Sequence, residues 1–224
     1  MFIDHSYIEG LLDAAKEASL EAIDHALSEA EAFKGLNHKQ VAMLLNLKDE
    51  TRLQRMFQIA GDIKRKIYGD RVVMFAPLYI SDYCVNNCTY CGYKRDNQFE
   101  RRRLTQAEIR EEVILLEKMG HKRLALEVGE DAKNAPIDYV VESIKTIYDT
   151  YESNGSIRRI NVNIAATSVD DYKKLKDAEI GTYILFQETY HQPTYEDIHP
   201  ASLKGDYLRQ LYAFDRAMEA GIDD

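Results

Sequence analysis

The three cysteines of the chain, Cys84, Cys88 and Cys91, lie within one stretch of eight residues. Their spacing is C-x3-C-x2-C, and an odd number of cysteines this close together is a poor framework for disulfides. Three thiolates can bind three irons of a 4Fe–4S cluster and leave the fourth iron open. A small molecule with an amine and a carboxylate can chelate that open iron. The spacing therefore predicts a metal cluster with one exchangeable corner.

This arrangement is typical of radical S-adenosylmethionine (SAM) enzymes, and Tyr90 places an aromatic side chain directly before the third cysteine. One electron from the reduced cluster breaks a C–S bond of the SAM sulfonium and yields methionine and a 5′-deoxyadenosyl radical. That radical attacks almost any C–H or N–H bond, so the protein has to exclude water and hold the substrate close. The cofactors carry the difficult step, while the protein binds and orients.

Two polar residues follow the second and third strand-like segments. Glu130 stands in the sequence Val-Gly-Glu-Asp, where the glycine allows a close backbone approach and the carboxylate can accept from the SAM ammonium. Asn163 can bond a ribose or a carboxylate. A solvated acidic turn and an ordinary polar residue at a strand end are the alternatives.

Further candidates follow the fourth strand-like segment. Glu188 leaves a buried strand, where a carboxylate needs a partner, so it is a better candidate than Glu130 on sequence grounds alone. Arg209 can pair bidentately with the SAM carboxylate, although a lone helical arginine is usually a surface residue. Tyr190 and His191 either face the substrate or pack, with packing favoured.

Strand-like and helical segments alternate from residue 71 onward. Strands are predicted over 72–80, 123–128, 158–166 and 182–187, and helices over 104–120, 135–152, 168–179 and 202–221. The continuous apolar run at 72–80 is typical of a strand buried on both faces. Thr105 and Glu108 form a capping box, and Gly120 suits a helix end. The alternation predicts right-handed βαβ units and a parallel sheet, with the cysteine loop at its carboxyl edge.

The pattern of residues 1–70 predicts a helical extension. Apolar residues recur at helical spacing over 8–15 and again over 23–30, a second short helix fits 39–47 with Asn37 as a possible N-cap, and a third fits 52–67. Residues 71–224 supply about four β/α units, whereas a complete barrel takes about 250 residues. The fold class expected is therefore α/β: the extension, then the first half of a TIM-type barrel, with the rest of the barrel and a C-terminal domain absent. A complete small α/β sheet is the alternative. A half barrel leaves the edge of its fourth strand unpaired, so the chain is expected to dimerise or aggregate.

Three stretches resemble the aromatic-amino-acid lyases of the radical SAM superfamily: PLYISDYCVNNCTYCGYKRDN, LEVGED and FQETYHQPTYEDIHP. The resemblance is closest to the iron–iron hydrogenase maturases that cleave tyrosine, with 2-iminoacetate synthase of thiamine biosynthesis as a near relative. It extends over essentially the whole chain.

The resemblance implies a set of site residues. Cys84, Cys88 and Cys91 match the cluster ligands, Tyr90 matches the aromatic near the SAM adenine, and Glu130 matches the acidic residue at the methionine amino group. Glu188 and Arg209 fall where related enzymes hold the SAM ribose and carboxylate.

The resemblance also implies an activity. The adenosyl radical takes a hydrogen from the tyrosine amino group, and the Cα–Cβ bond breaks to give p-cresol and dehydroglycine. In the maturase, dehydroglycine goes on to carbon monoxide and cyanide for the hydrogenase cofactor. The implied partners are tyrosine, a low-potential electron donor of the ferredoxin or flavodoxin type, and hydrogenase assembly proteins. A second iron–sulfur cluster, held by C-terminal cysteines, is expected only in a full-length protein, so this chain alone is expected to be inactive in the full reaction.

Three alternatives remain open at this point. The first alternative is a different radical SAM chemistry, either that of 2-iminoacetate synthase or that of an enzyme similar to biotin synthase. A zinc-binding scaffold needs a fourth ligand, for which His191 or His199 is available. A ferredoxin-type electron carrier normally uses a fourth cysteine for each cluster.

Composition excludes several classes of protein. The 224 residues include 29 Lys and Arg against 38 Asp and Glu, a net charge of −9, which argues against nucleic-acid binding. Hydrophobic residues make up 45% and charged residues 30%, as in globular proteins, and no apolar run approaches the length of a membrane span. The first ten residues lack a signal-peptide pattern. A reducing cytoplasm is the expected location.

Overall fold

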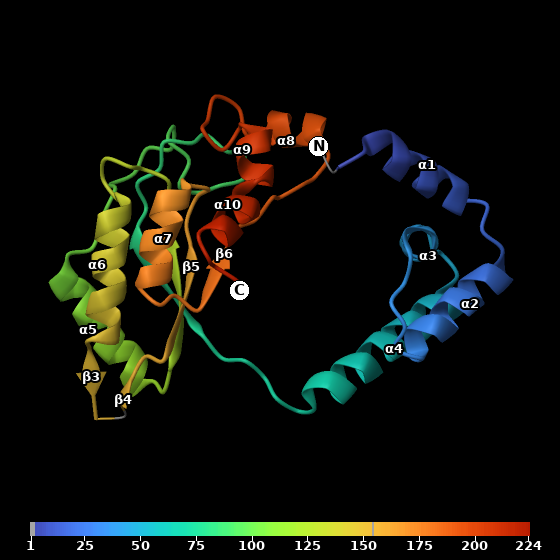
Figure 1. The fold of residues 1–224 in the computed structure, drawn as a ribbon, viewed down its shortest axis with the longest axis horizontal. Helices are drawn as coiled ribbons and strands as arrows, with labels where there is room; N and C mark the ends of the chain where they lie inside the picture. Colours follow the sequence, from blue (N-terminus) through green and yellow to red (C-terminus); the bar gives the residue numbers. More distant parts are fainter. Residues whose placement is uncertain (1–2, 154) are drawn as a thin grey trace. The chain divides into compact units, whose positions relative to one another are not determined.

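The structure, a computed structural model, describes residues 3–153 and 155–224 (Figure 1). Contacts within the chain divide it into two compact units, one that ends at Val73 and one that spans Met74–Asp224. Each unit has its own apolar core. No helix within the described residues combines the length and the apolar character that a membrane span requires.

The first unit is helical, as its apolar spacing predicts. It contains α1 (His5–Ala15), α2 (Leu20–Glu31), α3 (His38–Leu45) and α4 (Glu50–Tyr68). Ile23, Leu27, Leu47 and Ile59 form the core. Asn37 caps α3 and makes a capping box with Gln40, so the predicted N-cap is confirmed.

The second unit is built on a parallel sheet. Its strands β1 (Ala76–Ser81), β2 (Arg123–Val128), β5 (Arg159–Asn163) and β6 (Thr182–Ile184) pair in chain order. The crossover helices are α5 (Gln106–Lys118), α6 (Ile137–Tyr148) and α7 (Val169–Asp177). Figure 1 shows these helices side by side on one face of the sheet. The predicted α/β fold with parallel strands is confirmed.

The two faces of the sheet differ in composition because successive side chains of a strand point to opposite sides. One row of paired residues, Leu78, Leu126, Val162 and Tyr183, belongs to the core shared with α5, α6 and α7. The next row is Tyr79, Glu127, Asn163 and Ile184. This second row faces away from the helices and carries the polar groups.

Local signals set the ends of α5. The Thr105 hydroxyl accepts from the Glu108 amide, and the Glu108 carboxylate accepts from the Thr105 amide at 2.7 Å. These contacts confirm the predicted capping box. Gly120 has φ 95°, the left-handed conformation that glycine adopts readily beyond a helix end.

The prediction that residues 72–80 form a strand buried on both faces is wrong. Val72, Val73, Met74 and Phe75 precede β1 and are 54–73% exposed. Within β1 the burial alternates, with Tyr79 exposed and Leu78 and Ile80 buried. The reason is the position of β1 in the sheet. Among the described residues it is an edge strand that pairs with β2, with one further bridge from Ser81 to Arg103, and it packs against helices on one side.

Two predicted helices are shorter than expected. The helix predicted over 135–152 ends at Tyr148. The Thr150 hydroxyl donates to the Thr146 carbonyl, which would otherwise accept the next helical hydrogen bond. Two short antiparallel strands follow, β3 (Tyr151–Glu152) and β4 (Gly155–Ser156). The helix over 202–221 is two helices, α9 (Tyr207–Leu211) and α10 (Ala213–Glu219). Between them the Arg216 guanidinium donates to the Arg209 carbonyl at 2.7 Å and competes for a helical acceptor.

The carboxyl ends of the last two strands also differ from the prediction. β5 ends at Asn163 and β6 at Ile184, so the residues beyond them form loops, and the short helix α8 (Gln192–Ile198) follows. At the outer edge of β6, the Tyr183 amide donates to the Asp224 carbonyl at 2.9 Å. β6 is the last strand of the four-stranded sheet, so the expected edge at the fourth strand is present, and this backbone contact covers part of it.

Candidate active site

A cavity of about 290 Å³ lies at the carboxyl edge of the four-stranded sheet. Its walls come from the loops after all four strands and from the polar row of the sheet. The charged and polar side chains among its lining residues are Tyr79, Cys84, Asn86, Cys88, Tyr90, Cys91, Tyr93, Glu127, Glu130, Asn163, Glu188, Lys204 and Gln210. Residues spread over more than one hundred positions of sequence therefore meet in one place, as in other parallel α/β folds.

The loop after β1 carries the three thiols, all of which are free. Cys88 is buried and the other two are partly buried. Burial raises the pKa of the Cys88 thiol, while the nearby Lys204 ammonium acts in the opposite direction. The three thiols therefore point into a shielded site that contains a cation.

Arg101 braces this loop from within. Its guanidinium donates to the carbonyl oxygens of Asp82, Tyr93 and Lys94 at 2.6–2.7 Å. The Thr89 amide donates to the Ile198 carbonyl at 2.9 Å and ties the loop to the end of α8. These contacts give a glycine-containing, irregular segment a defined path.

Three free cysteines are the donor set that a 4Fe–4S cluster with one open iron requires. Within residues 3–153 and 155–224, no three His, Cys, Asp or Glu side chains form a group that could hold one metal ion. The three thiols line one cavity.

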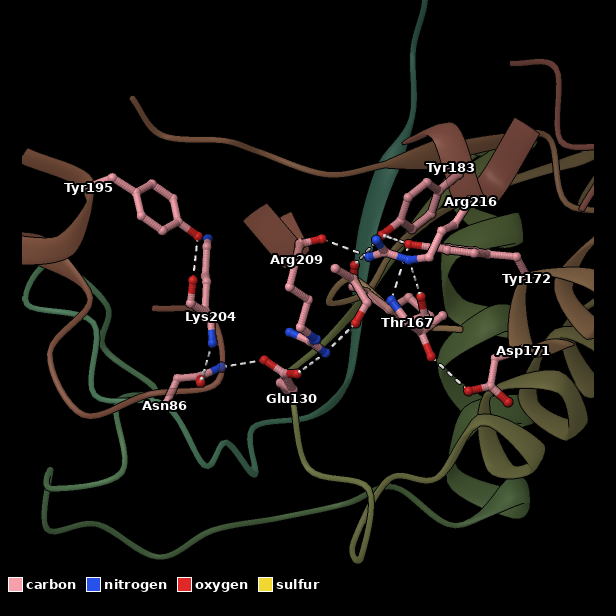
Figure 2. A network of polar contacts seen from close by, with 12 residues as sticks. Asn86, Glu130, Thr167, Asp171, Tyr172, Tyr183, Tyr195, Lys204, Arg209 and Arg216 are labelled. Atoms are coloured by element: carbon pink, nitrogen blue, oxygen red, sulfur yellow. Dashed lines mark hydrogen bonds and ion pairs between the residues drawn. The ribbon is translucent and has the colours of Figure 1, made fainter. Parts of the chain in front are cut away.

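Glu130 stands against the cysteine loop. A Cβ on the preceding Gly129 would collide with the Tyr83 carbonyl, so a glycine is required for this approach. The Val85 amide donates to the Glu130 carbonyl oxygen at 2.8 Å. The carboxylate accepts from Asn86 Nδ2 at 2.5 Å and from Arg209 Nη2 at 2.8 Å (Figure 2).

Arg209 lies between two cavities. Besides Glu130, its guanidinium donates to the Ala166 carbonyl. It lines a second cavity of about 380 Å³ that shares Glu130 with the first. Its Nη1 is buried and lacks a hydrogen-bond partner among the described residues. A planar guanidinium with an unpartnered buried N–H group suits a carboxylate ligand.

A second polar cluster lies beside Cys88. The Tyr90 hydroxyl is 3.0 Å from Glu188 Oε1 and 2.8 Å from His199 Nε2, and Lys204 Nζ is 2.8 Å from the same Glu188 oxygen. His199 Nδ1 lies 2.7 Å from the Tyr195 carbonyl, which only accepts, so the proton belongs on Nδ1. Burial lowers the pKa of His199 and raises that of Tyr90. The neutral phenol therefore has one proton, which it donates to Glu188 Oε1 or to His199 Nε2 but not to both at once.

Asn163 reaches across the sheet. Its amide donates to Glu127 Oε2 at 2.6 Å, and the two residues are neighbours in the polar row. Burial raises the pKa of Glu127, and the Asn163 hydrogen bond opposes that shift.

The structure brings most of the sequence-predicted residues together. Cys84, Cys88, Cys91, Tyr90, Glu130, Asn163 and Glu188 line the first cavity, and Arg209 contacts Glu130 from the second. Tyr190 and His191 line neither cavity. The Tyr190 side chain is exposed and its carbonyl accepts from Tyr207, while His191 precedes α8 and contacts Thr194.

Sequence reasoning missed several residues of the site, among them Asn86, Glu127, His199 and Lys204. Asn86 stands inside the cysteine motif, and Glu127 is an acidic residue within a strand, so each carried a weak signal. His199 was considered only as a zinc ligand. Lys204 lies in a predicted helix and had no signal.

Comparison with known proteins settles the family. The sequence model of the radical SAM superfamily matches residues 78–224. The chain belongs to the radical SAM superfamily. Members of this superfamily use a 4Fe–4S cluster and SAM, and the three cysteines of this radical SAM chain lie within the matched region.

Individual relatives refine this placement. A 2-iminoacetate synthase of Salmonella typhimurium is 30% identical over 201 residues, which cover 90% of this chain and 51% of that protein. A crystal structure of HydG, a maturase of the FeFe-hydrogenase, is 57% identical with a TM-score of 0.98 and covers 100% of this chain and 49% of its own. HydG from Carboxydothermus hydrogenoformans is 36% identical with a TM-score of 0.89, over 98% and 50% of the two chains. The radical SAM chain thus spans about half the length of these relatives.

Proposed function

We propose that this chain is the SAM-binding part of a radical SAM tyrosine lyase of the hydrogenase-maturase type. The reaction cleaves the Cα–Cβ bond of tyrosine and releases p-cresol and dehydroglycine. The observation that carries the proposal is the convergence of three free thiols with Glu130, Asn163 and Glu188 in one cavity. The 57% identity to a HydG structure supports the maturase branch.

Different residues of the chain would bind the cluster and the amino-acid part of SAM. Cys84, Cys88 and Cys91 would hold three irons of the cluster. When bound, the cluster and SAM supply a 5′-deoxyadenosyl radical by reductive cleavage of the sulfonium. The Glu130 carboxylate would accept from the SAM ammonium, and the unpartnered Nη1 of Arg209 would donate to the SAM carboxylate.

The remaining groups would hold the nucleoside part. Tyr90 would pack near the adenine, and Glu188, fixed by Tyr90 and Lys204, would accept from the ribose hydroxyls. Asn163 offers an amide on the same wall. Tyr190 and His191 remain proposed substrate contacts.

The chain spans about half the length of its relatives, so the whole reaction is a proposal for a longer protein. We propose that a longer protein carries a second iron–sulfur cluster on C-terminal cysteines and converts dehydroglycine into carbon monoxide and cyanide. It would receive electrons from a ferredoxin or flavodoxin and deliver its products to hydrogenase assembly proteins in the cytoplasm.

Product analysis tests the substrate assignment. A polypeptide that continues this chain through the remaining half of the relatives' length is reconstituted anaerobically and supplied with tyrosine, SAM and dithionite. We expect p-cresol in proportion to 5′-deoxyadenosine. SAM cleavage without p-cresol would reject a tyrosine lyase and favour another radical SAM chemistry.

The thiamine-branch enzyme 2-iminoacetate synthase is the second candidate, because a protein of that name shares 30% identity over 90% of this chain. The same assay separates the two through carbon monoxide, captured by deoxymyoglobin. We expect its release in the maturase and none in the thiamine branch.

A further inference from the structure

Asn86 lies between the first two cysteines and is 3% exposed, a buried polar side chain that none of the roles above uses. Both polar atoms of its side-chain amide have a hydrogen-bond partner. Nδ2 donates to Glu130 Oε2 at 2.5 Å, and Oδ1 accepts from the Lys204 amide at 3.0 Å (Figure 2). Rotating the amide by half a turn would break both bonds, so its orientation is fixed.

The backbone around Asn86 also forms hydrogen bonds, which fix its position. Its carbonyl accepts from the Arg95 amide at 2.7 Å, within the cysteine loop. The neighbouring Val85 amide donates to the Glu130 carbonyl at 2.8 Å. Glu130 is therefore attached to the cysteine loop through its backbone and through its carboxylate.

The two carboxylate oxygens of Glu130 are held separately. Asn86 binds Oε2 from the cysteine loop, and Arg209 binds Oε1 from α9. Each oxygen has more than one acceptor site, so an ammonium ligand can still be received. The direction in which the carboxylate presents its remaining lone pairs is fixed by these two donors.

We propose that Asn86 is a positioning residue that joins the cysteine loop and Glu130 into one unit. It holds the Glu130 carboxylate in the orientation that would receive the ammonium of SAM, while the adjacent cysteines would hold the cluster whose open iron SAM chelates. This inference rests on the proposed SAM-binding role of the cavity. A residue that only stabilised the loop would act on iron retention instead.

The neighbouring Asn87 provides a matched control. It belongs to the same loop and has the same side chain, but its Nδ2 donates to Asp96 at 2.7 Å rather than to Glu130. It is absent from the lining of either cavity. Any effect common to the two variants belongs to the loop, and any difference belongs to the Glu130 contact.

The test compares Asn86→Ala, Asn87→Ala and the parent chain after anaerobic reconstitution. Iron content, the thermal unfolding midpoint and the SAM dissociation constant are measured, the last from the SAM-dependent change in the EPR spectrum. We expect Asn86→Ala to bind SAM about tenfold more weakly or worse, with the iron content of the parent chain. Asn87→Ala is expected to match the parent chain.

Equal SAM affinity in Asn86→Ala and the parent chain would overturn the inference, as would parallel loss of iron and affinity in both variants. If Asn86→Ala shows no cooperative unfolding, the isosteric pair Asn86→Asp and Asn87→Asp replaces it, with the same expectation because the carboxylate introduced by Asn86→Asp would repel Glu130. A parent chain that holds the cluster without responding to SAM would contradict the proposed function itself, and the inference with it.

A double-mutant cycle adds an independent readout. If Asn86 acts through Glu130, adding Asn86→Ala to Glu130→Gln weakens SAM binding far less than it does in the parent chain. Additive losses would show that Asn86 acts independently of Glu130 and would overturn the inference.

Discussion

The Tyr90 hydroxyl donates a hydrogen bond of 3.0 Å to Glu188 Oε1, although the two residues are 98 positions apart in the chain. The contact joins the cysteine loop after β1 to the loop after β6. It supplies a partner for an acidic side chain that leaves a buried strand, and Lys204 supplies a second. The walls of the cavity are therefore linked by polar contacts as well as by the sheet.

Removing the Tyr90 hydroxyl should weaken SAM binding and spare the cluster. In Tyr90→Phe the ring remains, but Glu188 loses one donor, a loss of about 1 kcal/mol, which corresponds to a dissociation constant roughly fivefold higher. The EPR titration with SAM measures it. Tyr151→Phe, in an exposed residue of β3, should match the parent chain, and an unchanged constant in Tyr90→Phe would remove this contact from the binding site.

Lys204 is a cation in the cavity that also contains the three thiols. Its ammonium pairs with Glu188, and the two side chains are 19% and 29% exposed. In Lys204→Met a positive charge is lost and the Glu188 carboxylate loses its ion-pair partner, so adding an electron to the cluster becomes harder. We expect the midpoint potential to fall by an amount on the order of tens of millivolts, measured by redox titration.

Two variants control for this effect. Lys204→Arg keeps the charge and should keep the potential near that of the parent chain. Lys173→Met removes an exposed lysine of α7, whose partner is Asp170, and should have no effect. A potential that rises or stays constant in Lys204→Met would mean that this lysine does not influence the cluster.

Gly129 permits the close approach of the β2 loop to the cysteine loop. In Gly129→Ala the new methyl group would meet the Tyr83 carbonyl, and the backbone has to move. We expect a loss of about 1–3 kcal/mol in the free energy of unfolding, from urea titration of the metal-free chain. Gly92→Ala, where a Cβ has nothing within 4 Å, should change it by less than about 0.5 kcal/mol. Equal effects would refute the steric argument.

Glu108 gives the fold a predictable acid response. The Thr105 backbone amide and then the Arg102 guanidinium lower the pKa of this carboxyl to about 2. Because the unfolded value is higher, about 4.5, the contribution of the carboxylate to stability is complete above that value and is lost as the pH falls toward 2.

The stability difference between the parent chain and Glu108→Gln should therefore shrink as the pH is lowered from about 5 to about 2. Thermal unfolding at a series of pH values measures this difference. Glu111→Gln, on the same helix but outside the cap, should show no such trend. A difference independent of pH would contradict the assignment of the cap.

Local signals made much of the fold predictable. The N-cap at Asn37 and the capping box of Thr105 with Glu108 depend on residues close together in the sequence, so sequence alone predicted them. The helix ends near Tyr148 and Leu211 depend on side chains that capture backbone carbonyls, which apolar spacing does not report. The exposure of the run at 72–75 could not be predicted, because burial depends on neighbouring chain rather than on the composition of the run itself.

The site residues also differ in whether the sequence could predict them. Cysteine spacing is local, and Glu130 and Glu188 follow strands whose ends meet in any parallel sheet. Asn86 and Lys204 were missed because their partners lie 44 and 16 positions away, respectively. Only the folded chain shows that Asn86 and Lys204 line the cavity.

The most direct measurement is the EPR spectrum of the anaerobically reconstituted and reduced chain, with and without SAM. The account predicts a 4Fe–4S signal that changes on SAM addition, and its absence in Cys88→Ser together with loss of SAM cleavage. A chain that retains SAM cleavage after that substitution, or whose cluster spectrum is indifferent to SAM, would contradict the central claim.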